Sequence, residues 1–146
     1  MQLSAGELAN LKRLVKVLWL VLLISVCLYW PVLGLVQIER AEPPPVVTQA
    51  LMLMAIADAG AALFLRFNRI PTVWLRQPLD LAALNQLRTF YILCFVLAEA
   101  VALFGMILFF LGGSREQALW FFTGSVALFL LCYPRTPESP LGIPPQ

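Results

Sequence analysis

Histidine is absent from the 146 residues of the chain, and charged residues make up only 12% of it. Without histidine, a haem held by two histidines is excluded, and the commonest protein ligand of transition metals is missing. A net charge of +2 is too small to indicate a nucleic-acid partner. No nucleophile–base set, glycine-rich phosphate loop or metal-ligand cluster is present, so we expect no enzyme activity, cofactor or metal site.

Cysteine is scarce and shows no paired motif. Cys27, Cys94 and Cys132 are the three cysteines, and none belongs to a CxxC pair. Each lies in an apolar run, where a free cysteine behaves as a small apolar residue. We therefore expect all three to pack within helices, and they do not report on the redox compartment.

Apolar residues dominate what is present. The chain is 61% hydrophobic, whereas an ordinary soluble domain is nearer half. The apolar residues form four runs separated by short charged or proline-rich pieces. This pattern predicts an all-α polytopic membrane protein, with four transmembrane helices in one antiparallel bundle over residues 1–133. The expected spans are 17–36, 46–65, 89–111 and 117–133, and the proline-rich segment 134–146 is predicted to be a disordered tail.

Capping patterns indicate where several helices begin and end. Segments 4–7 and 114–117 both have the Ser-x-x-Glu/Gln form of a capping box, so a helix is expected to begin at each. Gly112 and Gly113 are expected to close the third span. Pro71, which follows two arginines, is expected to end the second helix.

The distribution of Lys and Arg predicts the orientation. The N-terminal arm holds three, the connection 66–88 holds four and the tail holds one, whereas the other side holds only Arg40 and Arg115. Positive residues favour the cytoplasmic side, so we expect a multi-pass protein of the plasma (inner) membrane with both termini cytoplasmic. A cleaved signal peptide is the alternative at the N-terminus, but 17–36 is long enough to span and no small-x-small cleavage site follows.

Two carboxylic acids lie at the middle of expected spans. Glu99 is central in the run 91–111, which contains no Lys or Arg, and Asp58 is central in 46–65. An acidic residue at mid-bilayer costs roughly 2.5–3.5 kcal/mol on insertion scales, so such residues are usually functional or paired. Counted from the flanking basic residues, the two acids differ in depth by about three residues, or roughly 4–5 Å. We expect both near one level of one interface.

Two roles remain open for these acids. Burial in hydrocarbon favours the neutral form of a carboxyl group, and no basic residue lies within the spans to oppose this. Both acids are therefore expected to be neutral at rest, and an acid that loses its proton to a cation from another chain is a proton carrier. Alternatively, both acids are protonated and only hydrogen-bond between helices.

Small residues surround Asp58. Ala57 and Ala61 form a small-xxx-small pair, and Gly60 lies between them. Such residues let the backbone of a neighbouring helix approach closely. We therefore expect Ala57, Gly60 and Ala61 to face a close neighbour.

A polar tripeptide precedes the run that carries Glu99. Arg-Gln-Pro at 76–78 is followed by Leu-Arg-Thr at 87–89 and then by Leu-Ala-Glu-Ala at 97–100. Over about residues 75–111, this order resembles the c subunit (proteolipid) of rotary F-type ATP synthases. The resemblance implies that Glu99 is the proton-carrying acid. It also implies a polar loop, which faces the rotor stalk in that family and here comprises Arg76, Gln77, Pro78 and Arg88.

Three functions are compatible with these features. The first is an integral membrane subunit with a mid-membrane proton-binding carboxylate, resembling the rotary ATP synthase proteolipid. The second is a structural or assembly subunit of a membrane complex with no ion-translocating role. The third is a small transporter in which Thr123 and Ser125 line a polar path with the two acids. The expected partners are membrane lipid and either other membrane subunits or further copies of the chain, but not nucleic acid.

Overall fold

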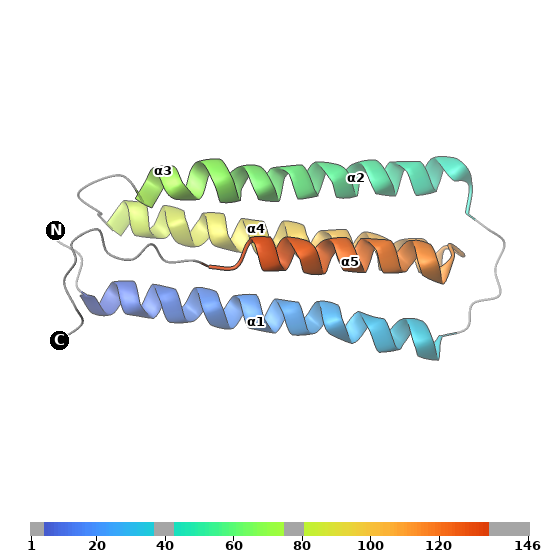
Figure 1. Ribbon diagram of the computed structural model, residues 1–146, viewed down its shortest axis with the longest axis horizontal. Coiled ribbons are helices and arrows are strands. Elements are labelled where there is room, and N and C mark those ends of the chain that lie inside the picture. The colour runs from blue at the N-terminus through green and yellow to red at the C-terminus, as the bar shows by residue number, and fades with distance from the viewer. Residues whose placement is uncertain (1–4, 37–42, 75–80, 135–146) are drawn as a thin grey trace.

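The computed structural model describes residues 5–36, 43–74 and 81–134, and every regular element in these ranges is a helix. The elements in chain order are α1 (Ala5–Leu35), α2 (Pro45–Phe64), the π-helix η1 (Leu65–Arg69), α3 (Ile70–Trp74), α4 (Leu81–Phe110) and α5 (Arg115–Leu131). The long helices lie side by side, with α4 (yellow) and α5 (orange) between α1 (blue) and α2 (teal) (Figure 1). The prediction of an all-α fold is confirmed for these residues. The predicted tail, 134–146, lies outside the described residues except for Pro134.

Three helical segments are long and apolar enough to cross a membrane: Ala9–Leu35, Pro45–Val73 and Leu81–Phe110. Large apolar side chains on the outer faces are exposed, as at Leu28, Leu53 and Val96. Because a soluble protein rarely exposes apolar patches this extensive, the outer surface fits a lipid environment. The fourth long helix, α5, has 17 residues and is about 25 Å long.

The junction between α4 and α5 forms as the sequence predicts. Gly112 has a φ of 99°, which glycine adopts at no steric cost. Its N–H donates to the Phe109 carbonyl (3.0 Å), and the Gly113 N–H donates to the Leu108 carbonyl (2.9 Å). This pair of hydrogen bonds is a Schellman motif, which satisfies the last carbonyls of α4.

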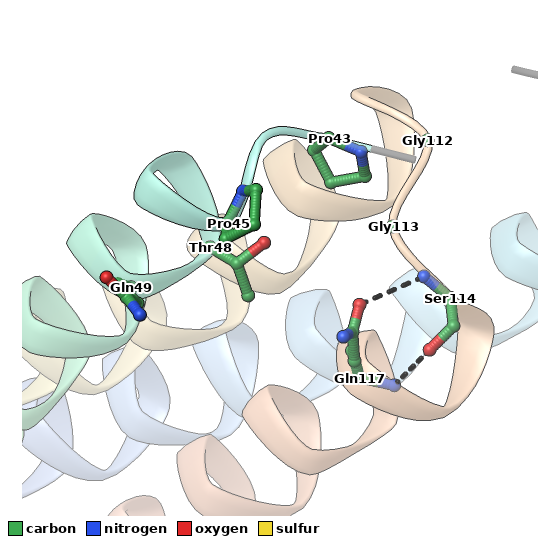
Figure 2. Close-up of a pocket in the computed structure, with 8 residues that line it drawn as sticks. All are labelled: Pro43, Pro45, Thr48, Gln49, Gly112, Gly113, Ser114 and Gln117. Carbon is green, nitrogen blue, oxygen red and sulfur yellow. Dashed lines mark hydrogen bonds between the residues drawn. The ribbon is translucent and has the colours of Figure 1, made fainter. Parts of the chain in front are cut away.

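The capping box at the start of α5 is also confirmed. The Gln117 N–H donates to Ser114 Oγ and the Ser114 N–H donates to Gln117 Oε1, both at 3.1 Å, as the dashed lines in Figure 2 show. Two backbone donors that a helix start leaves without partners are thereby satisfied. At the other predicted capping box, α1 begins at Ala5 as expected, while Ser4 lies outside the described residues.

The prediction that Pro71 ends the second helix is wrong. The helix continues from α2 through η1 into α3, which ends at Trp74. Pro71 has no N–H, and in an α-helix its ring would clash with the carbonyl four residues earlier, that of Phe67. In the turn before Pro71, the Ile70 N–H instead donates to the Leu65 carbonyl, five residues back. The wider π turn accommodates one extra residue and carries the helix past the proline.

Two arginines bind the C-terminal ends of neighbouring helices. Arg115 Nη2 donates to the Leu33 carbonyl of α1 at 2.8 Å. Arg66 donates through Nε to the Leu131 carbonyl and through Nη2 to the Tyr133 carbonyl, both at 3.2 Å. The last carbonyls of a helix lack partners within it and carry partial negative charge. Each guanidinium therefore satisfies and neutralises one helix end.

The core of the bundle lies along α4, which contacts α1, α2 and α5. This helix packs tightly against α5 at Gly105, where an added Cβ would lie 2.7 Å from Phe121 Cβ and 3.1 Å from the Ala118 carbonyl oxygen. Two turns away, buried Ser125 of α5 donates to the Ala98 carbonyl of α4 at 2.6 Å. These contacts fix the register of α5 on α4.

The small residues beside Asp58 do not pack as expected within the chain. Ala57, Gly60 and Ala61 are exposed, and a Cβ added at Gly60 would meet nothing within 4 Å. The inner side of α2 instead carries Ala55 and Ala62, which are buried. Any close neighbour of these exposed small residues therefore lies outside the described part of the chain.

Gly105, which is closely packed, and Gly60, which meets open space, give a direct test of the packing. We expect Gly105→Ala to destabilise the fold by about 1–3 kcal/mol, because the methyl group forces α4 away from α5. Thermal unfolding in detergent micelles measures this, and Gly60→Ala is the matched control, expected to be neutral or slightly stabilising because it meets open space on a helix. Equal stability of the two variants would contradict the contact at Gly105.

Candidate functional site

Glu99 meets two hydroxyl groups of α1. Its Oε1 accepts from Ser25 Oγ at 3.2 Å and from Tyr29 OH at 3.3 Å. The two hydroxyl oxygens are themselves 3.3 Å apart. All three side chains are partly buried. Three oxygens from two helices therefore form a triangle within apolar surroundings.

The local sequence of α1 explains why both hydroxyls face α4. Ser25 and Tyr29 are four residues apart and so lie one above the other on one helix face. Val26, next to Ser25, is buried, and the Tyr29 ring lies 6.1 Å from that of Phe122 on α5. Sequence reasoning missed both partners. The i, i+4 pair of hydroxyl residues in an apolar run was the available signal, but nothing local shows which helix faces it.

The triangle can hold Glu99 in either protonation state. An ionised carboxylate accepts a hydrogen bond from each of the two hydroxyls. A neutral carboxyl group brings a hydrogen of its own, so three hydrogens are then available for the three pairs of oxygens. The distances exceed the typical 2.7–2.8 Å of an O–H···O hydrogen bond. Both bonds go to Oε1, and Oε2 of Glu99 accepts no hydrogen bond from the described residues.

Glu99 lies at the edge of the outer surface of α4. Val96, three residues before it, and Leu103, four residues after it, are both exposed. Residues at i−3 and i+4 flank a side chain on the same helix face. The carboxyl group is therefore held by α1 on one side and borders the lipid-facing stripe of α4 on the other.

Asp58 is partly buried on α2. It makes no hydrogen bond within the described ranges 5–36, 43–74 and 81–134. Its neighbours on the helix face, Met54 and Ala61, are exposed, whereas Ala62 is buried against α4. Asp58 thus lies at the edge of the α2–α4 contact, next to the exposed small residues.

The two acids share a level but not an interface. Cys94 Sγ of α4 lies 3.5 Å from the Ala62 carbonyl oxygen of α2, and this register places Asp58 opposite Ala98. Asp58 and Glu99 therefore differ in depth by less than one helical turn, about 5 Å, in line with the expected level. Glu99 faces α1, however, and α1 does not contact α2 in the described structure. The expectation of one shared interface is wrong, because α4 separates the two flanks.

The hydroxyls proposed for a transport path have other roles. Ser125 donates to the Ala98 carbonyl within the α4–α5 contact. Thr123 is exposed and donates to the Leu119 carbonyl of its own helix at 2.9 Å. In the described structure neither hydroxyl bonds to Glu99, Ser25 or Tyr29, so these contacts do not support a polar path along α5.

Of the residues expected in the polar loop, the structure describes Arg88. Its side chain is exposed on α4, eleven residues before Glu99 and so about 16 Å from it along the helix axis. Arg76, Gln77 and Pro78 lie outside the described residues. That these residues and Arg88 form one polar loop stays a prediction.

An open pocket of about 400 Å³ lies where the start of α2 meets the α4–α5 junction. Its lining residues, Pro43, Pro45, Thr48, Gln49, Gly112, Gly113, Ser114 and Gln117, are drawn in Figure 2. Ser114 and Gln117 are engaged with each other there, and Thr48 and Gln49 are the other polar side chains of the lining. In the described part of the chain, no three His, Cys, Asp or Glu side chains cluster as metal ligands.

No family model, no curated protein and no solved structure matches the chain.

Removing the two hydroxyls tests their contact with Glu99. In the double variant Ser25→Ala/Tyr29→Phe, we expect the fold to be less stable by about 1–3 kcal/mol, because the partly buried carboxyl group of Glu99 loses both of its hydrogen-bond partners. Thermal unfolding in detergent micelles measures this. Thr123→Val, which removes a hydroxyl that bonds to the Leu119 carbonyl of its own helix, is the control and should have a much smaller effect. An unchanged unfolding temperature in the double variant would contradict the contact.

Proposed function

We propose that this chain is an integral membrane subunit that binds and releases a proton at Glu99. The observation that carries the proposal is the triangle of Ser25, Tyr29 and Glu99 midway along α4. A protonated acid there avoids the cost of a buried charge, and the ionised acid retains two hydroxyl donors. The site can therefore change protonation state without rearranging the helices.

The resemblance to the rotary ATP synthase proteolipid supports the same role. Glu99 takes the position of the proton-carrying acid, and Arg76, Gln77, Pro78 and Arg88 take positions of the polar loop. The exposed stripe of α4 beside Glu99, which includes Val96 and Leu103, gives a partner subunit access to the carboxyl group. We expect that partner to be another membrane subunit or a further copy of the chain.

In this proposal the bundle spans the membrane four times, with α5 as the short fourth span. Arg115 opens α5, and Arg66 binds the carbonyls of Leu131 and Tyr133 at its far end. The two arginines thus lie about 25 Å apart along the helix, close to the roughly 30 Å of a hydrocarbon core. The Lys and Arg bias then places both termini in the cytoplasm.

The second candidate is a structural subunit without ion chemistry. The same hydrogen bonds favour it, because Glu99 joins α4 to α1 through Ser25 and Tyr29. In that case the acid stays protonated and serves only as a donor and acceptor between helices. Variants that keep hydrogen bonding but remove titration distinguish the two roles.

Glu99→Gln is such a variant. The variant should keep the fold, since the amide retains the shape and hydrogen bonding of the acid. It should abolish labelling of residue 99 by a hydrophobic carbodiimide, a reagent that needs a protonated carboxyl group. It should also stop proton-coupled activity of the host membrane complex. Labelling is read by mass spectrometry, and proton flux by a pH-sensitive dye in inverted membrane vesicles. Asp58→Asn is the matched control and should leave the labelling of Glu99 intact. If Glu99→Gln leaves proton flux unchanged while Glu99→Leu destabilises the protein, the structural role is the better account.

The four-span topology is tested with single cysteines in a variant whose native cysteines are replaced by alanine. Glu116→Cys, at the start of α5, should react with a membrane-impermeant maleimide in intact cells. Asn68→Cys, in η1, should react only after the cells are opened, because it lies on the cytoplasmic side. Gel-shift labelling measures both. Labelling of both positions in intact cells, or of neither, would contradict the proposed orientation.

A further inference from the structure

Two buried thiols meet in a part of the α4–α5 contact that the Glu99 site does not use. Cys94 of α4 and Cys132, the residue that follows α5, are both fully buried. Their side chains are neighbours that interact with each other. Cys94 also donates to the Ala62 carbonyl of α2. The third cysteine, Cys27, is exposed.

The register of the two helices requires this contact. Gly105 of α4 packs directly against Phe121 of α5. Cys94 precedes Gly105 by eleven residues, and Cys132 follows Phe121 by eleven residues. Eleven residues make about three turns of α-helix, so both antiparallel helices return to the same face at the same level. The two sulfurs are therefore brought together by helix packing and not by a flexible approach.

A positive charge lies near both thiols and is bound to the residues that flank Cys132. The Arg66 guanidinium binds the carbonyls of Leu131 and Tyr133, the residues on either side of Cys132. A neighbouring arginine stabilises a thiolate, and the thiolate is the nucleophile in reactions of cysteine. Cys132 is thus placed to react first, with Cys94 next to it as the second thiol.

We propose that Cys94 and Cys132 form a redox pair, which a small peroxide converts into an intramolecular disulfide that ties the C-terminal end of α5 to α4. The Cys132 thiolate attacks one peroxide oxygen, the O–O bond breaks, and a sulfenic acid and water result. The Cys94 sulfur then attacks the sulfenic sulfur, and the S–OH oxygen leaves as water. Two protons and two electrons leave the protein, and one molecule of hydrogen peroxide is reduced to two waters.

The surroundings of the pair give the reaction its selectivity. Both sulfurs are enclosed by α2, α4 and the end of α5, so a small uncharged oxidant can reach them more easily than a bulky one. Oxidation also removes the hydrogen on Cys94 that binds the Ala62 carbonyl. The disulfide would therefore fasten α5 to α4 and at the same time release one contact of α2.

Peptide mapping tests the proposal on the full-length protein in detergent micelles. The protein is treated with hydrogen peroxide, its remaining thiols are alkylated, and it is denatured and digested with trypsin. Cleavage after lysine and arginine places Cys27, Cys94 and Cys132 in three separate peptides, 17–40, 89–115 and 116–135. We expect 89–115 and 116–135 to be recovered as one linked species, lighter by two hydrogens than the reduced pair and separated by a thiol reductant.

Single substitutions provide the controls. Cys27→Ala should leave the linked species unchanged, whereas Cys94→Ala and Cys132→Ala should each abolish it. The unfolding temperature should rise on oxidation in the wild type and in Cys27→Ala, and return on reduction. Recovery of both peptides unlinked from peroxide-treated wild type, or linkage only through Cys27 of two molecules, would overturn the proposal even if a single variant failed to fold.

Discussion

The contact between α4 and α5 at Gly105 determines how the other parts of the bundle meet. Because glycine has no side chain, the backbones approach until Phe121 fills the space that a Cβ would take. This approach sets one register along the interface, which brings Ser125 to the Ala98 carbonyl. The α4–α5 pair then offers a groove on each flank, and α1 and α2 occupy these two grooves without contacting each other in the described structure. Glu99 meets its hydroxyl partners only because α1 fills its side.

Polar groups in such a bundle have no water to bind, so each must find a partner in the protein. Trp19 Nε1 donates to the Phe129 carbonyl at 2.8 Å, and Ser125 donates to the Ala98 carbonyl at 2.6 Å. These are short, fixed bonds to backbone oxygens that cannot titrate. The bonds of Glu99 differ in kind, because its partners are rotatable hydroxyls at longer distances. This difference fits the proposal that Glu99 exchanges a proton, whereas Trp19 and Ser125 hold the bundle together.

Features that depend on local sequence were predictable, and those that depend on helix contacts were not. The Schellman motif at Gly112 and the capping box at Ser114 involve neighbours along the chain, and both were predicted. The prediction for Pro71 was wrong because the rule that proline ends a helix applies to an α-helix. A π turn removes the clash between the proline ring and the Phe67 carbonyl. The two central acids could be identified from the sequence, because an acidic residue in lipid is energetically costly. Their hydrogen-bond partners could not, because those contacts depend on the packing of helices that are distant in sequence. Glu99 binds Ser25, which lies 74 residues away.

Asp58 gives a second argument that the chain is part of an assembly. Glu99 is satisfied within the chain, whereas Asp58 has no hydrogen-bond partner in the described structure and borders the exposed residues Ala57 and Ala61. An unpaired carboxyl group in hydrocarbon is costly even when neutral, and exposed small residues lose the packing that a larger side chain would make with lipid. Both costs fall if a helix of another molecule lies against this face of α2 and offers Asp58 a donor. One chain thus carries a satisfied acid and an unsatisfied one at the same depth, which favours the proposal that it acts as a subunit rather than alone.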